Sequence, residues 1–317
     1  MVNSKLSIII PFYGQKESQL TVPLASINNQ TAVDFSQINV HLVNDASAPI
    51  DSAVLQEVFP NLDLHYHELN ENVGAGLARQ YGIDHSESDY IMFIDADDRL
   101  FQENSLAYFF EALEKDGDHE LISSYYDWEE LLDDGALAIH QGTFDFLTVY
   151  ARWFSRQFLE QQNIRFSPEL RMFEDFYLME IANQIATDHI HVDQITYLNR
   201  YRASSLTNAK KFTTTGEFVK SYRLQLEYYR DKGYEAQLQQ QFEGLLVNIY
   251  LYHAKLRPVG EDEAAFQVEL SQLLDEFPQL RKPYSVDLQN YVDQHSRNKQ
   301  DPYYGVATAD LKDFLGN

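Results

Sequence analysis

The sequence predicts an α/β protein, in which a mostly parallel sheet is covered by helices and is followed by a smaller helical domain. Over the first 200 residues, short apolar runs alternate with segments of helical spacing, and this alternation is typical of parallel sheets. Beyond about residue 210, the apolar residues recur at helical spacing. We therefore expect a first domain over residues 1–209 and a helical domain over 210–317.

The strands are the most distinct elements of the first domain. Residues 6–10 form a near-continuous apolar run that Pro11 closes, as expected of a strand buried on both faces. Apolar runs or alternating apolar and polar residues predict further strands at 38–43, 62–67, 90–94, 121–128 and 189–202. Another short strand is expected just before Pro168.

Helices are expected where apolar residues recur every three or four positions. In the first domain these ranges are 22–29, 52–59, 74–84, 105–114, 152–162 and 174–185. In the second they are 217–231, 235–256 and 261–276. The acidic residues 129–134 and Gly135 are expected to form a loop.

The composition excludes several classes of function. The 317-residue chain has a formal net charge of −25, which argues against a nucleic-acid partner. It has no cysteine, which excludes disulfides, zinc–thiolate sites and thiol catalysis. No window approaches the roughly 20 apolar residues of a transmembrane segment, and the N-terminus does not resemble a secretory signal. We expect a cytoplasmic protein that would act at the inner face of a membrane only from outside the bilayer.

Polar clusters follow three of the expected strands at the point where each strand ends. They are Phe12-Tyr13-Gly14, then Asp45, then Asp95-Ala96-Asp97-Asp98. Sites in parallel sheets lie at the carboxyl ends of the strands. Crowded carboxylates repel one another unless a cation lies among them, and Mg²⁺ or Mn²⁺ prefers such oxygen ligands. The alternative for 95–98 is an acidic loop that caps the next helix.

Asp45 and the segment 72–79 each allow two interpretations. Asp45 is either a turn residue or a carboxylate that accepts a hydrogen bond from a nucleobase. The segment 72–79 lacks the third glycine of a dinucleotide fingerprint, because Arg79 stands there. It is better interpreted as a helix N-terminus whose dipole and Arg79 could face a diphosphate, or as an ordinary helix start with a surface arginine.

Two further groups of titratable residues are candidates. Glu174 and Asp175 open an apolar helix, where they either complement the helix dipole or provide an ionised general base. His189 and His191 share one face of an expected strand. That spacing permits a metal pair, but packing is the favoured interpretation, and it stays open whether either histidine joins the metal site.

Taken together, six segments resemble the family 2 inverting glycosyltransferases with the GT-A fold. They follow one another in the family's order and spacing from residue 5 to about residue 207. The six segments are Ser7 to Tyr13, Asn44 to Ser47, Asn72 to Gly82, Phe93 to Asp98, Glu174-Asp175 and Tyr201-Arg202. The chain departs from the family pattern at Asn44, at Ala46, where glycine is usual, and at Gly14-Gln15.

The resemblance implies a Rossmann-like GT-A domain of the type that builds bacterial cell-surface polysaccharides. A UDP-sugar would be the donor, and a glycan, a lipid-linked glycan or a glycoprotein would be the acceptor. For the donor nucleotide, the resemblance implies contacts with Pro11, Tyr13, Asp45, Arg79 and Asp95. Among these, Asp45 would bind the uracil, and Asp95 would touch the ribose or the metal.

The resemblance also implies the residues of the reaction centre. Asp97 would ligate Mn²⁺ or Mg²⁺ at the diphosphate, and Asp175, with Glu174 beside it, would be the general base. Tyr201 and Arg202 would contact the acceptor or the diphosphate. Inversion at the anomeric carbon would need no covalent intermediate.

Two other functions remain as alternatives from the residues alone. A nucleotidyltransferase would need a Gly-rich basic phosphate loop, which Pro11-Phe12-Tyr13-Gly14 is not. A non-catalytic module that binds carbohydrate or a protein partner would not need Asp97 and Asp175. The C-terminal helices are expected to shape the acceptor side or to form a homodimer contact. Most of their tyrosines, which include Tyr228, Tyr229, Tyr250 and Tyr252, are expected to pack as core.

Overall fold

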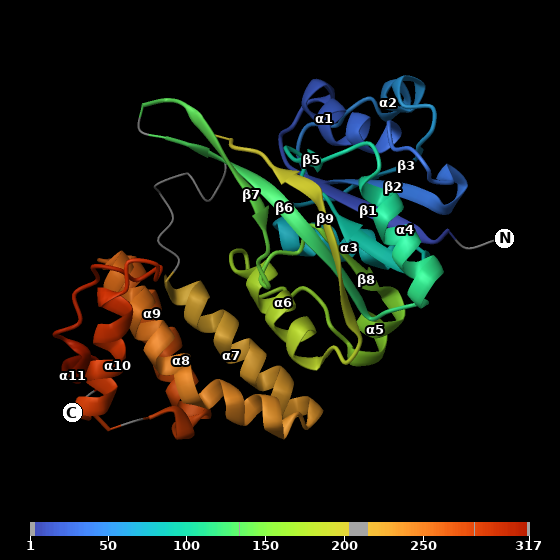
Figure 1. Ribbon diagram of the computed structural model, residues 1–317. Coiled ribbons are helices and arrows are strands. Elements are labelled where there is room, and N and C mark those ends of the chain that lie inside the picture. The colour runs from blue at the N-terminus through green and yellow to red at the C-terminus, as the bar shows by residue number, and fades with distance from the viewer. Residues whose placement is uncertain (1–3, 133, 203–214, 282, 316–317) are drawn as a thin grey trace. The chain divides into compact units, whose positions relative to one another are not determined.

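The computed structural model describes residues 4–132, 134–202, 215–281 and 283–315. It divides the chain into two compact units, Met1–Asn208 and Ala209–Asn317. Figure 1 labels their helices and strands. The first unit is a mixed α/β domain and the second is helical, so the fold class predicted from the sequence is confirmed.

The sheet of the first unit begins with four parallel strands in the order β3-β2-β1-β4. Their bounds are Leu6–Phe12 for β1, Ile38–Asn44 for β2, Asp63–Glu68 for β3 and Tyr90–Phe93 for β4. The sheet continues through β8, β6, β9 and β5, and β7 pairs with β6. These bounds are Arg99–Leu100 for β5, Leu121–Leu131 for β6, Leu137–Thr143 for β7, Arg152–Ser155 for β8 and His189–Asn199 for β9.

Six helices of the first unit connect these strands. They are α1 (Glu17–Asn28), α2 (Ser52–Val58), α3 (Ala75–Asp84), α4 (Ser105–Asp116), α5 (Arg156–Gln162) and α6 (Glu174–Ile185), counted within the described residues. A short 3₁₀ turn over Phe35–Gln37 leads into β2. Because three parallel strands end beside one another, the loops after β1, β2 and β4 lie at one edge of the sheet.

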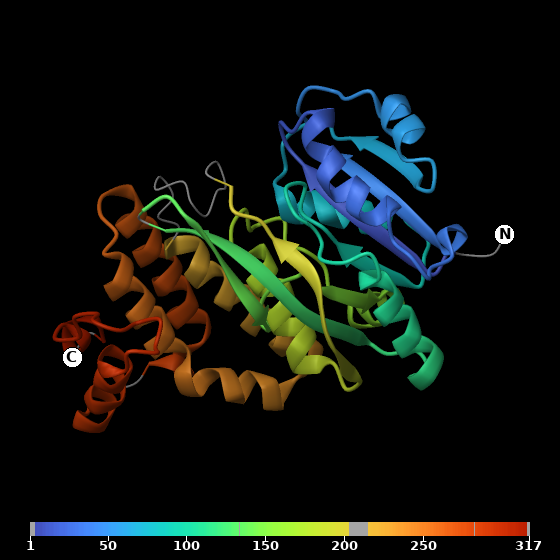
Figure 2. The same ribbon diagram turned by 45° about the horizontal axis from the view of Figure 1, so that its top comes forward.

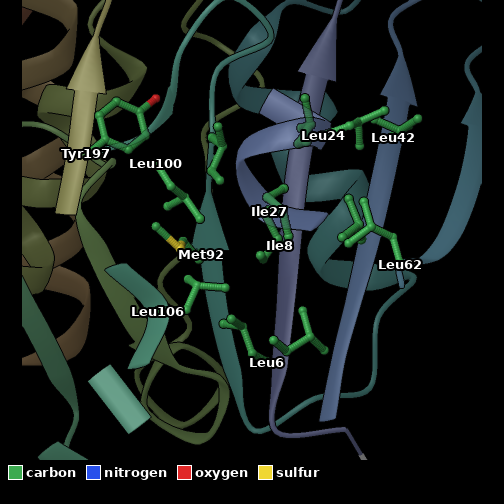
Figure 3. Close-up of a cluster of buried hydrophobic side chains, with 14 of the residues drawn as sticks. Leu6, Ile8, Leu24, Ile27, Leu42, Leu62, Met92, Leu100, Leu106 and Tyr197 are labelled. Atoms are coloured by element: carbon green, nitrogen blue, oxygen red, sulfur yellow. The ribbon is translucent and has the colours of Figure 1, made fainter. Parts of the chain in front are cut away.

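The strand β1 is fully buried because helices cover both faces of the sheet. On one face, Ile8 and Ile10 belong to the same core cluster as Leu24 and Ile27 of α1, and Figure 3 shows Ile8 beside Ile27. On the other face, a Cβ atom at Gly82 of α3 would lie 2.5 Å from Cγ2 of Ile9. Such a distance is too short for packed carbon atoms, so the close approach of α3 to β1 requires glycine at this position.

The strands β6 and β7 form a long hairpin where the acidic sequence 129–134 predicts a loop, and that prediction was wrong for residues 129–131. Leu131 pairs with Leu137 across the hairpin, and Glu130 binds His140 at 2.8 Å. Cross-strand pairs of this kind stabilise strands whose acidic side chains would otherwise repel one another. Figures 1 and 2 show the hairpin extending beyond the neighbouring strands.

Two other expectations for the first unit also need correction. The helix expected from Arg152 begins only at Arg156, because Ser155 caps it by accepting a hydrogen bond from the backbone N–H of Phe158. The residues before it form β8, whose Phe154 pairs with Leu121 of β6. The short strand expected just before Pro168 is absent from the described residues there.

The second unit consists of α7 (Thr215–Lys232), α8 (Glu235–Leu256), α9 (Glu261–Glu276), α10 (Val286–Arg297) and α11 (Leu311–Phe314), with a 3₁₀ turn over Pro278–Leu280. Tyr229 and Tyr250 are buried, and Tyr252 packs on Phe218 with ring centroids 3.9 Å apart. The core interpretation of these tyrosines is confirmed. Within the described residues, no helix has the length and apolar character needed to cross a membrane.

Candidate active site

The first feature of the site is Asp45, which follows β2 and is only 3% exposed. Its two carboxylate oxygens accept hydrogen bonds from the backbone N–H groups of Val73 at 2.7 Å and Gly74 at 2.9 Å. Gly74 has a φ of +90° and starts α3, so Asp45 fixes the point at which this helix begins. Each oxygen already has one partner, and the expected contact with a nucleobase stays a prediction.

The second feature is Arg79, which lies one turn into α3 and whose side chain is 4% exposed. The sequence suggests a surface arginine or one that faces a diphosphate. Its guanidinium instead donates to Asp95 at 2.7 Å, to Asp175 at 2.8 Å and to Glu174 at 3.3 Å. Arg79 thus joins the loop after β4 to the start of α6, and it does not reach the surface.

This network shifts the pKa values of Arg79, Glu174 and Asp175. Burial alone would lower the pKa of Arg79, but Asp175, Asp95 and Glu174 outweigh burial and raise it. Burial raises the pKa of Glu174 to about 8, and the neighbouring Asp175 adds to that shift. Burial also raises the pKa of Asp175, while Arg79 opposes the rise and Asp95 adds to it. The helix N-terminus predicts an easily ionised Asp175, whereas the structure gives a carboxyl with a raised pKa.

The loop after β4 separates its carboxylates into two groups. Asp98 is 1% exposed and accepts hydrogen bonds from the Tyr197 hydroxyl at 2.7 Å and from the backbone N–H of Arg200 at 2.8 Å. Burial raises its pKa well above the usual range, and Asp95 adds to the shift. Asp98 therefore anchors the loop to β9, which leaves Asp95 and Asp97, each with a 31% exposed side chain, in contact with solvent.

These carboxylates line a cleft of about 550 Å³ in the first unit, a size suited to a small ligand. Its walls come from the loop after β4, from the hairpin strand β6, from α6 and from the chain after β9. The lining residues are Asp95, Asp97, Asp98, Trp128, Glu129, Glu130, Leu131, Tyr150, Asp175, Asn199, Arg200, Tyr201 and Arg202. Asp97 contacts Arg202 at 3.3 Å, and the backbone N–H of Tyr201 donates to Glu129 at 3.1 Å.

The cleft brings together some of the residues predicted from the sequence but not all of them. Asp95, Asp97, Asp175, Tyr201 and Arg202 line it. Glu174 joins through its contact with Arg79. The cleft lining does not include Pro11, Tyr13, Asp45 or Arg79. Pro11 is buried in β1, and Tyr13 is 60% exposed just beyond that strand.

His189 and His191 lie in β9 and share one partner. Nε2 of His189 lies 2.8 Å and Nδ1 of His191 lies 3.0 Å from the Ser123 hydroxyl. Burial lowers the pKa of both histidines. Neither histidine lines the cleft, and packing remains the better interpretation.

The donor atoms of the cleft fit a divalent ion that substrate oxygens help to hold. In the described part of the chain, no group of three or more histidine, aspartate or glutamate side chains could hold a metal ion by itself. Magnesium is commonly bound through one or two carboxylates together with substrate phosphates. Asp97 and Asp95, which both line the cleft, could provide such a pair of oxygen ligands.

Sequence reasoning missed several residues of the cleft wall. Trp128 and Glu129 lie in β6, Tyr150 precedes β8, and Arg200 follows β9. Tyr150 stacks on Tyr197 with centroids 4.7 Å apart. An aromatic residue directly before an acidic run was the available signal for Trp128, but the sequence does not show which strands are neighbours and so does not place Trp128 beside the loop after β4.

The first unit thus combines a mixed α/β sheet with an acidic cleft beside the ends of its parallel strands, and comparison with known proteins shows the family to which such a chain belongs. The family model described as "Glycosyl transferase family 2" matches residues 7–173, which is more than half of the 317-residue chain. The chain therefore belongs to glycosyltransferase family 2 and is a transferase enzyme. This result decides against the nucleotidyltransferase and the non-catalytic module.

Curated relatives and a solved structure extend the comparison. The amylovoran biosynthesis glycosyltransferase AmsB of Erwinia amylovora is 36% identical over 150 residues, which cover 43% of this chain and 45% of AmsB. The glycosyltransferase GlyA of Streptococcus pneumoniae is 24% identical over 231 residues, which cover 65% of this chain and 32% of GlyA. The chain thus spans less than half of the length of either relative.

The fold is similar to that in the crystal structure of S. aureus TarS 1-349 in complex with UDP-GlcNAc. That similarity has a TM-score of 0.67 at 16% identity, and it covers 92% of this chain and 85% of that one. At this identity the likeness shows the GT-A fold alone. It includes most of the helical second unit as well as the α/β domain.

Proposed function

We propose that this enzyme transfers a sugar from a UDP-sugar to a hydroxyl group of an acceptor, with inversion at the anomeric carbon. The observation that carries the proposal is that Asp97 and Asp175 line one cleft next to the carboxyl ends of the parallel strands. A ligand in that cleft could contact both Asp97, which would bind a metal ion, and Asp175, which would accept a proton. The acceptor would be a glycan, a lipid-linked glycan or a glycoprotein, as in bacterial polysaccharide synthesis.

Asp175 is the proposed general base. The hydroxyl oxygen of the acceptor would form a bond to the anomeric carbon while the bond from that carbon to the diphosphate oxygen breaks, and Asp175 would accept the hydroxyl proton. A raised carboxyl pKa suits this role, because a base with a pKa nearer the working pH accepts a proton more readily. Arg79 would act as a positioning residue, since it holds Asp175 at 2.8 Å and Asp95 at 2.7 Å.

Asp97 is the proposed ligand of Mn²⁺ or Mg²⁺, with Asp95 next to it at the ribose or the metal. When bound, the ion would supply Lewis-acid stabilisation of the charge that develops on the departing diphosphate. Arg200 and Arg202 would add positive charge on this side of the cleft, because both contact Asp97. Pro11, Tyr13 and Asp45 would lie toward the nucleotide.

The proposal is supported by two independent sources. The first is that Asp175 and Asp97, proposed as base and metal ligand, line the same cleft. The structurally similar TarS protein was crystallised with UDP-GlcNAc, which favours a UDP-sugar as the donor here.

The test is release of the nucleoside diphosphate from UDP-, GDP- and CDP-sugars, measured with and without added Mn²⁺. We expect release from a UDP-sugar, dependence on the ion and inversion in the product's NMR spectrum. Asp97→Ala should abolish the ion-dependent release, because the alanine side chain has no oxygen that could bind the ion. The matched control is Asp118→Ala, because this aspartate is 75% exposed and contacts Lys5 instead of the cleft. Near-normal turnover of Asp97→Ala, with an unchanged circular dichroism spectrum, would refute the metal assignment.

A further inference from the structure

The β6–β7 hairpin carries a stacked aromatic pair, Trp128 and His140. The two residues pair across the hairpin, and their rings lie 3.9 Å apart at an angle of 10°. Nε2 of His140 also contacts the Glu130 carboxylate at 2.8 Å. The imidazole is therefore held by stacking on Trp128 at one face and by Glu130 at its edge, and this arrangement orients the indole.

Trp128 also lines the cleft that contains Asp175. One face of the indole is covered by His140, and the side chain is only partly buried. A rigid aromatic ring with restricted rotamers loses little entropy when a ligand packs on it. The structure thus supplies a flat, pre-oriented apolar surface in a cleft whose other walls are mostly polar.

The charges around Trp128 select among ligands. Glu129 and Glu130 follow it in sequence and line the cleft with it, so an anionic group on this side would meet two carboxylates. Arg200 and Arg202 both contact Asp97, on the side of the cleft assigned to the donor. The hairpin side therefore suits a neutral, flat ligand whose C–H groups can lie on an aromatic face and whose hydroxyls can bond to carboxylates. A pyranose ring has these properties.

We propose that Trp128 is the stacking platform for a neutral pyranose ring of the acceptor, and that the hairpin β6–β7 is the acceptor subsite. This inference rests on the proposed function, because it assumes that Asp175 activates an acceptor hydroxyl in the same cleft. It assigns to Trp128 a contact with the ring that carries the nucleophilic hydroxyl or with the ring next to it.

Intrinsic fluorescence tests the proposal directly, because the chain has two tryptophans and the other, Trp153, is 0% exposed. The probes are the methyl glycosides of glucose, galactose and N-acetylglucosamine, with glycerol 3-phosphate as an anionic comparison. In the presence of saturating UDP and Mn²⁺, at least one glycoside should change the emission of the wild type, and glycerol 3-phosphate should not. Trp128→Phe should remove the signal.

Kinetics provide the second measurement. Trp128→Ala should raise the KM for the glycoside acceptor about tenfold, the usual effect of losing one stacking contact, and Trp128→Phe should raise it less. The matched control is Phe146→Ala, which removes a 56% exposed aromatic ring outside the cleft lining and should leave the KM for the acceptor unchanged.

Each outcome either supports or overturns the proposal. A fluorescence change caused by UDP alone, and not enhanced by any glycoside, would show that Trp128 stacks on the nucleotide. No change with any glycoside, or a change with glycerol 3-phosphate only, would also overturn it. Release of UDP from the donor by the wild type, measured without acceptor in the same samples, separates a failure of the Trp128 proposal from a failure of the proposed function. If that release occurs while the glycoside signal is absent, only the platform fails, and if no UDP-sugar is turned over, the proposed function fails.

Discussion

Asp175 is the residue on which the proposed chemistry depends most. Asp175→Asn keeps the shape of the side chain but removes its basicity, so turnover should fall by about 10²–10⁴-fold, the usual contribution of a positioned general base. The affinity for UDP, measured by calorimetry, should hardly change, because the residue would face the acceptor. Loss of UDP binding would show instead that Asp175 contacts the nucleotide or holds the fold.

Glu174 offers a matched control in the same network. Burial raises the pKa of Glu174, so this carboxyl is protonated more readily near neutral pH than an ordinary glutamate, and glutamine is a close mimic of a protonated glutamate. Glu174→Gln should therefore lower turnover much less than Asp175→Asn does at pH 7. If the two variants lost activity equally, the base could not be assigned to Asp175 alone.

Ala46 stores backbone strain next to the site. It has a φ of +57°, where an L-residue costs roughly 1–2 kcal/mol more than glycine, although glycine gains entropy in the unfolded chain. Ala46→Gly should thus raise the free energy of unfolding by up to about 1 kcal/mol. Urea denaturation would measure it, with Ala53→Gly in the first turn of α2 as a control that should be destabilised. A loss of stability in Ala46→Gly would mean that the alanine methyl group makes contacts worth more than the strain.

Single motifs indicated candidate site residues but not their partners. The sequence places Arg79 correctly in the first turns of a helix, yet its partners Asp95 and Asp175 are 16 and 96 residues away. Helical spacing says nothing about contacts over such separations. For the same reason Asp98, which the sequence cannot distinguish from Asp95 and Asp97, proves to be the buried anchor of the loop.

Strands β2 and β3 and helix α3 meet at a cluster of four histidines, His41, His65, His67 and His85. The rings of His41 and His67 lie 5.2 Å apart and nearly parallel, and His41 stacks on His65 as well. Burial lowers the pKa of His41 to about 3, with His65 and His67 adding to the shift. Burial also lowers the pKa of His67, with His85 and His65 adding to that shift. Asn39 and Tyr81 face the cluster, the first as a partner of His41 and the second stacked on His85.

This cluster predicts loss of stability in mild acid. An unfolded histidine binds a proton near pH 6.5, whereas folded His41 does so only near pH 3. The unfolded state therefore binds more protons between these values, and the free energy of unfolding should fall as the pH falls from about 6.5 toward 3. The slope that His41 adds is at most about 1.4 kcal/mol per pH unit.

The measurement is urea denaturation of the wild type and of His41→Gln from pH 7.5 to pH 4.5. The variant should start less stable, since it loses packing, but its stability should depend less on pH. His65→Gln is the comparison, because the His65 side chain is 44% exposed and burial is the largest cause of the lowered pKa of His41, so its pH dependence should change less than that of His41→Gln. An unchanged slope in His41→Gln would show that other groups cause the acid sensitivity.

The elements that could be predicted from the sequence are those buried on both faces. An apolar run such as 6–10 admits few other structures, and the observed β1 covers it with two further residues. The end of β6 and the strand β7 escaped prediction because these exposed segments carry charge, as at Glu129 and Glu130, and are stabilised by partners on the other strand. The predicted strand 121–128 includes Trp128, but without the end of β6 nothing in the sequence indicated that this wall of the cleft exists.

For the whole molecule, the family model ends at residue 173, and the second unit, Ala209–Asn317, lies outside it. The cleft with its candidate base and metal ligand is formed by residues of the first unit alone. The second unit has a core of its own, in which Tyr250 of α8 packs with Val292 of α10 and Leu311 of α11. The first unit also has its own core, which includes Leu6, Ile8 and Met92, so we expect it to fold without the second.

A chain that ends at Asn208 separates the roles of the two units. It should bind UDP and release UDP slowly from the donor, because the residues proposed for both steps lie in the first unit. It should lose transfer to the acceptor used by the full chain if the second unit shapes the acceptor side. Calorimetry would measure UDP binding, circular dichroism would check the fold, and light scattering on both chains would show whether a dimer contact is lost with the helices. Full transfer by the shortened chain would exclude the second unit from acceptor recognition and would leave the hairpin β6–β7 to perform it alone.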